Sequence, residues 1–325
     1  MKFRKPIVLM LALALVMTFA PLYAFAEEAE EAEFSLTTGL PTDKAYKPLT
    51  VTIDNTAAAR PQMNISMADV MYEIEITNGG YTRYFAVYND EVPEIVEPVR
   101  SARMVHVDIY LEWGGALVHH GGQPHAETSF FDYAKKMGTD GNYDGLNSRF
   151  FYRDGSRKAP YNSVARLQDI QNDLTDDIRP RSPLKFNPDY PTIKGDDVLE
   201  FSITYRANCS PSYMYNEDDG LYYRYYGGKE FIDGATKEQI TCANVIVMRV
   251  NYSWYGGDAE RPQGLLTGTN ECDYFIGGKH FKGTWSRESV TQNTVYLDDE
   301  GEEVMFVPGQ TYIQIIKDGL NIDIK

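Results

Sequence analysis

The second half of the chain restricts the fold most. From about residue 198 onward, short apolar or alternating runs follow one another, separated by turn signals such as Asp219-Gly220 and Gly277-Gly278. No long stretch there has apolar residues at helical spacing. This pattern is typical of antiparallel β-structure, arranged as a small barrel or sandwich. The expected strands are 198–205, 213–215, 221–226, 244–251, 273–276, 294–297, 304–307 and 312–316.

The first half mixes strands and helices. Strands are expected at 48–55, 68–76, 82–88 and 116–119, and helices at 101–113, 125–137 and 163–174. Ser101 is the expected N-cap of the first helix, and 139–162 is expected to be a polar loop. A proline-rich stretch over 179–191 marks a boundary. The sequence therefore predicts an α+β protein, with an N-terminal mixed α/β domain (35–182) followed by a mostly antiparallel β domain (192–325).

The N-terminus has the organisation of an export signal. Lys2, Arg4 and Lys5 precede an apolar run from Pro6 to Pro21, and Ala24-Phe25-Ala26 is a small-x-small cleavage site. We therefore expect residues 1–26 to be a removable signal peptide and the mature protein to be secreted, or extracytoplasmic, without a stable membrane span. Residues 27–34, which include five glutamates, are expected to form a disordered acidic spacer.

Charge and cysteine content narrow the functions further. The formal net charge is −16, and loss of the three cations of the signal makes it −19. Nucleic-acid binding is therefore not expected, because phosphate contacts need a surplus of Lys and Arg. No cysteine precedes Cys209, so no thiol near the cleavage site can carry a lipid. Cys209, Cys242 and Cys272 allow either one disulfide with one free thiol or three buried thiols.

Two basic segments suggest an anion pocket. Arg100, Ser101 and Arg103 surround an expected helix start, where guanidinium groups would lie beside free backbone N–H donors. The loop 153–162 adds further candidates, namely Arg153, Arg157 and Asn162. In the alternative interpretation, the helix-start arginines pair with Glu97, Asp108 or Glu112, and the loop is a solvated turn.

A second set of residues suggests acid/base chemistry. Asp54, Glu73 and Glu75 lie on or near expected core strands. Glu73 and Glu75 share one face of a strand, and paired carboxylates can cleave glycosidic bonds. His119 precedes a Gly121-Gly122 turn and is a candidate assisting group. The alternative is that the carboxylates balance nearby arginines. We expect no metal, since no recognised ligand spacing is present, and no cofactor.

Several segments, taken in order, resemble the YerB-like family of secreted or lipid-anchored bacterial envelope proteins, a domain of unknown function. They are Ile53-Asp54-Asn55, Ala59-Arg60-Pro61-Gln62, 68–73, 80–84, 98–103, Val118-His119, Gly121-Gly122, 153–162, Gly283-Thr284-Trp285 and 308–312. The resemblance implies a two-part envelope protein and supplies no activity. This chain lacks the family's N-terminal cysteine, has Tyr161 where the family reads His, and has His120 at a typically small position, so His120 is interpreted as peculiar to this chain.

Three functional hypotheses follow. The first is a binding protein whose arginine-rich pocket holds an anionic cell-wall component, a glycan or its peptide carboxylates. The second is a cell-wall glycan hydrolase or lyase that uses Glu73 or Asp54 with His119. The third is a scaffold that binds another envelope protein through the tyrosine-rich second half. A carboxylate in one pocket with His119 would favour the enzyme, whereas a pocket of arginines alone would favour binding.

Overall fold

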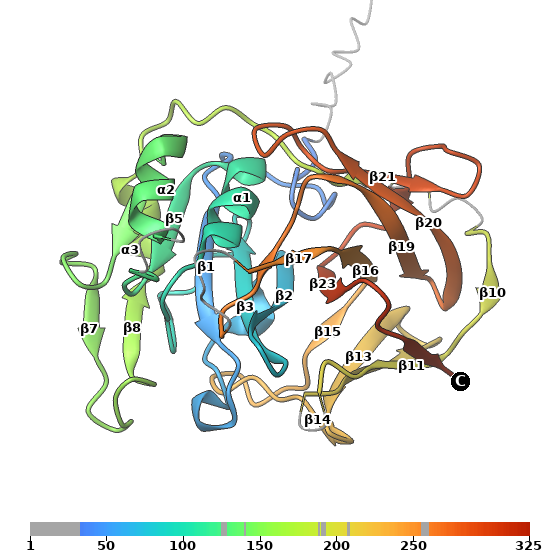
Figure 1. Ribbon diagram of the computed structural model, residues 1–325, viewed down its shortest axis with the longest axis horizontal. Helices are drawn as coiled ribbons and strands as arrows, with labels where there is room; N and C mark the ends of the chain where they lie inside the picture. The colour runs from blue at the N-terminus through green and yellow to red at the C-terminus, as the bar shows by residue number, and fades with distance from the viewer. Residues whose placement is uncertain are drawn as a thin grey trace, which may run out of the picture. The chain divides into compact units, whose positions relative to one another are not determined.

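One long β-sheet carries strands from both halves of the chain (Figure 1). The computed structural model describes residues 33–124, 129–139, 141–187, 189, 193–206, 209–254 and 260–325, and Glu33–Lys325 form one compact unit. The expected signal peptide, all of the spacer except 33–34, and residues 125–128 of the expected second helix lie outside the described residues. In order across the sheet, the strands are β10 (Asp196–Asp197), β20 (Lys279–Arg287), β19 (Gly268–Ile276), β16 (Asn244–Val250), β23 (Thr311–Lys317), β2 (Val70–Thr77), β3 (Tyr81–Tyr88), β1 (Leu49–Asp54), β5 (Ala116–His119) and β6 (Asn142–Asp144), with β21 (Val295–Asp298) on β20.

Strand β23 joins the two halves. It comes from near the C-terminus and lies between β2 and β16, parallel to both, with Ile313 opposite Tyr72 and Ile246. Every residue of β23 except Lys317 is buried. A parallel strand covered on both faces needs such a continuous apolar run. The regions predicted as two domains therefore share one sheet. Instead of closing into a barrel, the second half extends this sheet.

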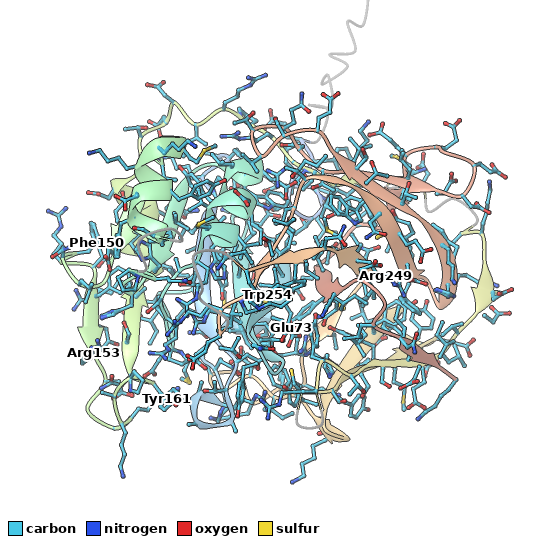
Figure 2. The ribbon with its side chains drawn as sticks, in the orientation of Figure 1. Glu73, Phe150, Arg153, Tyr161, Arg249 and Trp254 are labelled. Atoms are coloured by element: carbon cyan, nitrogen blue, oxygen red, sulfur yellow. The ribbon has the colours of Figure 1, made fainter. Side chains whose placement is uncertain are left out.

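The remaining strands form smaller sheets. In Figure 2, Phe150 and Arg153 lie on one side of the unit and Arg249 lies toward the other. The second sheet contains β14 (Lys229–Glu230), β13 (Leu221–Tyr226), β12 (Pro211–Asn216), β11 (Glu200–Ile203), β24 (Ile322–Ile324) and β15 (Thr241–Cys242). The short sheets are β4 (Ile95–Val96) with β8 (Ser163–Arg166) and β7 (Phe151–Arg153), β17 (Tyr252–Ser253) with β18 (Gln263–Gly264), and β22 (Met305–Phe306) with β9 (Lys185–Phe186).

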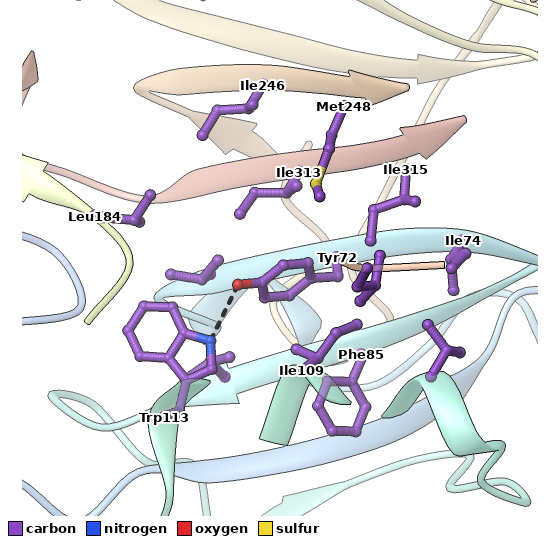
Figure 3. Packing of buried hydrophobic residues seen from close by; sticks show 14 of the residues in the cluster. Tyr72, Ile74, Phe85, Ile109, Trp113, Leu184, Ile246, Met248, Ile313 and Ile315 are labelled. Carbon is purple, nitrogen blue, oxygen red and sulfur yellow. Dashed lines mark hydrogen bonds between the residues drawn. The ribbon is translucent and has the colours of Figure 1, made fainter. Parts of the chain in front are cut away.

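Two apolar cores lie on opposite faces of the long sheet, because neighbouring residues of a strand point to opposite faces. Tyr72 faces the core of helices α1 (Met104–Trp113) and α2 (Phe130–Met137). Figure 3 shows this core, in which Trp113 Nε1 donates to the Tyr72 hydroxyl at 3.1 Å. Met71 faces the other core, formed with the second sheet and helix α3 (Leu167–Asp173). Short 3-10 helices span Ala57–Ala59 and Ile65–Met67.

The predicted α+β class, a mixed α/β first half followed by a mostly antiparallel β second half, is confirmed. Several local predictions were wrong. Ser101 does not cap α1: the N-cap is Arg103, whose N–H donates to His106 Nδ1 at 2.7 Å. The expected third helix begins as strand β8, and the expected loop 139–162 contains β6 and β7. In the last two cases, pairing with other strands overrode the local pattern.

All three cysteines are buried free thiols, so the second of the two predicted cysteine states is the observed one. Burial raises the pKa of Cys209 to about 11, which keeps its thiol protonated at neutral pH. In the described part of the chain, no helix has the length and apolar character of a membrane span.

Candidate functional site

The carboxyl ends of three parallel strands meet at one edge of the long sheet. β1 ends at Asp54, β5 at His119 and β6 at Asp144, and β5 pairs in parallel with both of the others. The segment that carries Arg100 runs along this edge, because Arg100 N–H donates to Thr52 O at 2.9 Å and Arg100 O accepts from His120 N–H at 3.0 Å. In α/β sheets, ligands characteristically bind at such an edge.

Asp54 holds Arg100 in place. Arg100 Nε lies 2.6 Å from Asp54 Oδ2, and the carboxylate is 1% exposed. Although burial alone raises the pKa of Asp54, the charge of Arg83, hydrogen bonds from Thr56 and the charge of Arg100 lower it below its usual range, so it is ionised. One carboxylate therefore serves two guanidinium groups.

The outer end of Arg100 is uncommitted. Its side chain is 26% exposed, and its two Nη nitrogens have no hydrogen-bond partner among the described residues. The guanidinium carbon lies 5.7 Å from the centroid of the Tyr161 ring. Arg100 thus combines a fixed inner contact with donors that are available to a ligand.

His120 positions the second arginine. Arg153 Nη2 lies 2.6 Å from His120 Nε2, and Ser163 Oγ lies 2.7 Å from His120 Nδ1. Because arginine only donates, Nε2 must accept and Nδ1 must carry the proton. Burial and the charge of Arg153 lower the pKa of His120, which favours this neutral form. The interpretation of His120 as peculiar to this chain did not include this contact, for which the sequence offers no signal.

Asn162 completes the support of Arg153. Its Oδ1 accepts from Arg153 Nη1 at 3.1 Å, and its Nδ2 donates to Asp154 O at 3.1 Å. Ser101 Oγ donates to His120 O at 3.1 Å on the opposite side of the cluster. Figure 2 shows Arg153 and Tyr161 toward the same end of the unit. The structure thus gathers four of the six predicted ligand-binding residues, Arg100, Ser101, Arg153 and Asn162, around His120; we call this the arginine site.

The other two predicted ligand-binding residues lie elsewhere. Arg157 donates to the backbone carbonyls of Ala59 and Pro61, so its guanidinium holds the 59–61 loop. Arg103 lies at the start of α1, where its side chain donates to Ala102 O at 3.3 Å. For Arg157, proximity in sequence to Arg153 therefore did not predict a shared contact with His120.

His119 is committed to the fold. Its ring is fully buried, with Nδ1 2.9 Å from Gly121 O, Nε2 2.6 Å from Asn142 Oδ1, and an edge-on contact with Phe130. The nearest carboxylate oxygen, Asp144 Oδ1, lies 3.9 Å from Nδ1. With both nitrogens engaged and no exposed surface, the ring fixes the turn after β5. This arrangement favours a structural role over the predicted acid/base role.

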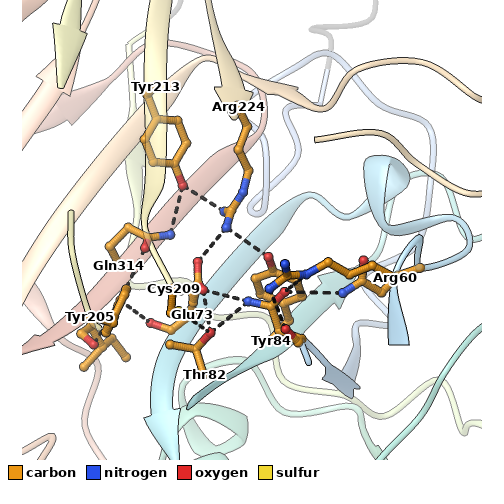
Figure 4. A network of polar contacts seen from close by, with 12 residues as sticks. Arg60, Glu73, Thr82, Tyr84, Tyr205, Cys209, Tyr213, Arg224 and Gln314 are labelled. Carbon is orange, nitrogen blue, oxygen red and sulfur yellow. Dashed lines mark hydrogen bonds and ion pairs between the residues drawn. The ribbon is translucent and has the colours of Figure 1, made fainter. Parts of the chain in front are cut away.

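Glu73 also lies in a closed network (Figure 4). Its Oε2 is 2.7 Å from Arg224 Nη2, and both side chains are 0% exposed. Its Oε1 accepts from Asn55 Nδ2 at 2.8 Å and from Thr82 Oγ1 at 2.6 Å. Arg224 belongs to the second sheet, so this ion pair joins the two layers. The geometry therefore favours the interpretation that Glu73 balances an arginine, and the partner was not predictable from neighbouring sequence.

Within the described residues, no group of three or more His, Cys, Asp or Glu side chains is placed to hold a metal ion. At the outer face of β6 lies an open hollow of about 580 Å³, and no residue of the arginine site is among the described residues that line it. Asn142, Asp144, Arg149 and Asp173 are among the residues that line it.

Comparison with known proteins supplies the family but no activity. Residues 37–179 match the family described as "Protein of unknown function (DUF3048) N-terminal domain", and residues 201–313 match its C-terminal domain. The chain is 27% identical over 306 residues to "Putative lipoprotein YerB" of Bacillus subtilis, covering 86% of this chain and 85% of that protein. The crystal structure of the B. subtilis YerB protein has the same fold, with a TM-score of 0.76, 24% identity, and coverage of 90% of this chain and 99% of that one.

Proposed function

Because the chain belongs to the DUF3048 family of unknown function, we propose a function for it from its own geometry: it binds an anionic component of the cell wall at the arginine site. The ligand group is a carboxylate or a phosphate. The setting is extracytoplasmic, which the expected signal peptide and the name of the B. subtilis relative support.

The observation that carries the proposal is the state of Arg100. A guanidinium held at Nε by a buried carboxylate, with both Nη groups partly open to solvent, can donate two parallel hydrogen bonds to one carboxylate or phosphate. Arg153 is held by His120 and Asn162, which fix its position before a ligand arrives. Such preorganisation reduces the entropy lost on binding.

The charge of the whole chain makes this site selective. A protein with a formal net charge of −16 repels anions over most of its surface. The carboxylate that contacts Arg100, Asp54, is already in an ion pair with the Arg100 guanidinium. Favourable anion contacts are therefore expected at the open guanidinium donors of Arg100.

Glycan cleavage is less well supported than binding. Asp54 is bonded to Arg100, Glu73 is paired with Arg224, and His119 has both nitrogens engaged. General acid/base catalysis needs a group that can reach a substrate and exchange a proton with it. These three groups are committed to contacts inside the protein, so we propose binding alone.

Pelleting with purified cell-wall sacculi tests the proposal. The samples are the wild type, Arg100→Gln, Arg153→Gln and the double variant. Arg179→Gln is the matched control, since it removes the same charge from an exposed residue outside the site. We expect each site variant to bind about tenfold to a hundredfold more weakly, the value of one charge-assisted contact, and the control to bind like the wild type.

The same experiment separates the hypotheses. Equal loss in Arg179→Gln and in the site variants would show that pelleting follows net charge and not this site. Soluble glycan fragments released by the wild type would favour the hydrolase or lyase. Pelleting that survives in the double variant would rule out the arginine site as the place of binding.

A further inference from the structure

A small cavity lies on the face of the long sheet that the helices cover. It is formed by the first turns of α1, by α2, and by β18 with the segment that follows it, and its volume is about 200 Å³. That volume corresponds to about six water molecules at liquid density. The described residues that line it are Met104, Val105, Asp108, Tyr133, Gln263, Gly264, Leu265, Leu266, Thr267 and Val290.

Most of the wall is apolar, and four polar side chains interrupt it, those of Gln263, Asp108, Tyr133 and Thr267. Gln263 supplies the first acceptor. Gln263 is 3% exposed, and its Oε1 has no hydrogen-bond donor in the described structure. Among the described residues, its Nε2 makes one long contact, 3.4 Å, with Arg261 O. A buried carbonyl oxygen without a donor destabilises a protein, so its presence beside a cavity indicates a missing partner.

Asp108 is the second acceptor. Its Oδ1 accepts from the Tyr133 hydroxyl at 2.6 Å. Burial raises the pKa of Asp108 to about 6, although the Tyr133 hydrogen bond and the charge of Arg287 oppose this rise. Arg287 donates to the backbone oxygen of Asp108, at 2.9 Å, and lies 3.6 Å from Glu112, so its ion-pair partner is a different carboxylate.

We propose that this cavity binds the alkylammonium group of a small organic cation. The ammonium would donate to Gln263 Oε1 and to the Asp108 carboxylate, while its alkyl stem would pack on Val105, Leu266 and Val290. A water molecule can supply a donor to Gln263, but it carries no charge to balance the carboxylate and gains little from the apolar walls. This cavity would bind a cation, whereas the arginine site would bind an anion. The inference therefore goes beyond the function proposed above.

Titration of the full chain with n-butylammonium chloride, followed by NMR, tests the inference. The neutral analogue n-butanol has a similar shape, and Asp108→Asn keeps the shape of the side chain without its charge. Asp177→Asn, an exposed position with the same charge change, is the matched control. We expect saturable millimolar binding of butylammonium, with intermolecular NOEs to the methyl groups of Leu266 and Val290. Loss of the charge should weaken binding about tenfold or more.

Each other outcome would overturn the inference. Absence of saturable butylammonium binding to the wild type would show that the cavity takes no such ligand. Equal affinity for butanol and butylammonium would show an apolar cavity that does not recognise charge. Unchanged binding by a folded Asp108→Asn would place the cation elsewhere, and NOEs in the wild type decide the question if that variant does not fold.

Discussion

At the scale of single residues, the arginine site depends on groups that hold the arginines. Asp54 fixes Arg100 through Nε, and neutral His120 accepts from Arg153. His120 in turn needs space: a Cβ on Gly145 would lie 2.2 Å from His120 Nδ1. The side chains of Asp54, His120 and Asn162, together with Gly145, therefore set where the two guanidinium groups point.

Gly145→Ala should weaken sacculus binding indirectly, through His120 and Arg153. The added methyl group must displace the His120 ring, and Arg153 then loses the acceptor that positions it. We expect about tenfold weaker pelleting, with little change in secondary structure by circular dichroism. Gly155→Ala is the control, because a Cβ there meets no atom within 4 Å. Wild-type binding by Gly145→Ala would show that the position of His120 is unimportant.

Arg224→Met should destabilise the protein strongly. It leaves the Glu73 carboxylate buried without its ion-pair partner, which costs about 3–5 kcal/mol of unfolding free energy. Urea unfolding measures this loss. Lys194→Met removes an exposed pair, with side chains 63% and 64% exposed, and should leave the unfolding free energy almost unchanged. Similar losses in the two variants would contradict a structural role for Glu73 and Arg224.

Sequence reasoning identified most arginines of the site but not what each one contacts. The segments 98–103 and 153–162 indicated clustered guanidinium groups, and Arg100 and Arg153 do share a site. Arg157 instead binds carbonyls of the 59–61 loop. The pairing of Glu73 with Arg224 spans 151 residues, so only the tertiary structure can reveal it.

At the scale of elements, hydroxyl groups of residues 35–38, the segment after the acidic spacer, hydrogen-bond it to the rest of the fold. Thr37 Oγ1 donates to Asp69 Oδ2 at 2.7 Å, and Ser35 and Thr38 donate to the Asp90 carboxylate at 2.8 and 2.7 Å. Burial and the nearby charge of Asp90 raise the pKa of Asp69 to about 7. The attachment of this segment should therefore depend on pH.

Asp69→Asn should flatten the dependence of stability on pH. The pKa of Asp69 is near 7 in the folded chain and about 4 in the unfolded chain. The contribution of Asp69 to stability is therefore fully present below pH 4 and is lost as the pH rises through 7. The wild type should lose up to about 4 kcal/mol relative to the variant between pH 4 and 8. Urea unfolding at several pH values measures this loss, with Asp43→Asn as an exposed control. Parallel curves for wild type and Asp69→Asn would contradict the shift.

Elements with a clear local pattern were predictable. The strands expected at 48–55, 82–88 and 116–119 correspond to β1, β3 and β5. β20 was not expected, because its residues, Lys279–Arg287, mix charges with a central glycine. A Cβ on Gly283 would lie 2.0 Å from Leu297 O, so the glycine allows β21 to approach. That requirement comes from a partner strand and leaves no local signal.

At the scale of the whole molecule, the two family regions share one sheet. β2 of the first region pairs with β23 of the second, and the Glu73–Arg224 pair joins the layers. Because these contacts cross between the regions, neither can unfold and leave the other intact. This consequence could not be predicted from the chain order, which places β2 and β23 more than two hundred residues apart.

We therefore expect Glu33–Lys325 to unfold in one cooperative transition. Single-tryptophan variants that retain either Trp113 or Trp285, both buried, report on the first and the second region respectively. Their urea unfolding curves should coincide, as required for a two-state transition. Two separated midpoints would show that the regions unfold independently in spite of the shared sheet.

The central claim is that Arg100 and Arg153 form one anion site. NMR of ¹⁵N-arginine-labelled protein, titrated with inorganic phosphate against a chloride control, tests it most directly. The Nε–Hε signals of Arg100 and Arg153 should shift together and saturate at one concentration, ahead of exposed Arg179. Shifts that grow linearly at all exposed arginines, or a response confined to one of the two, would contradict the site.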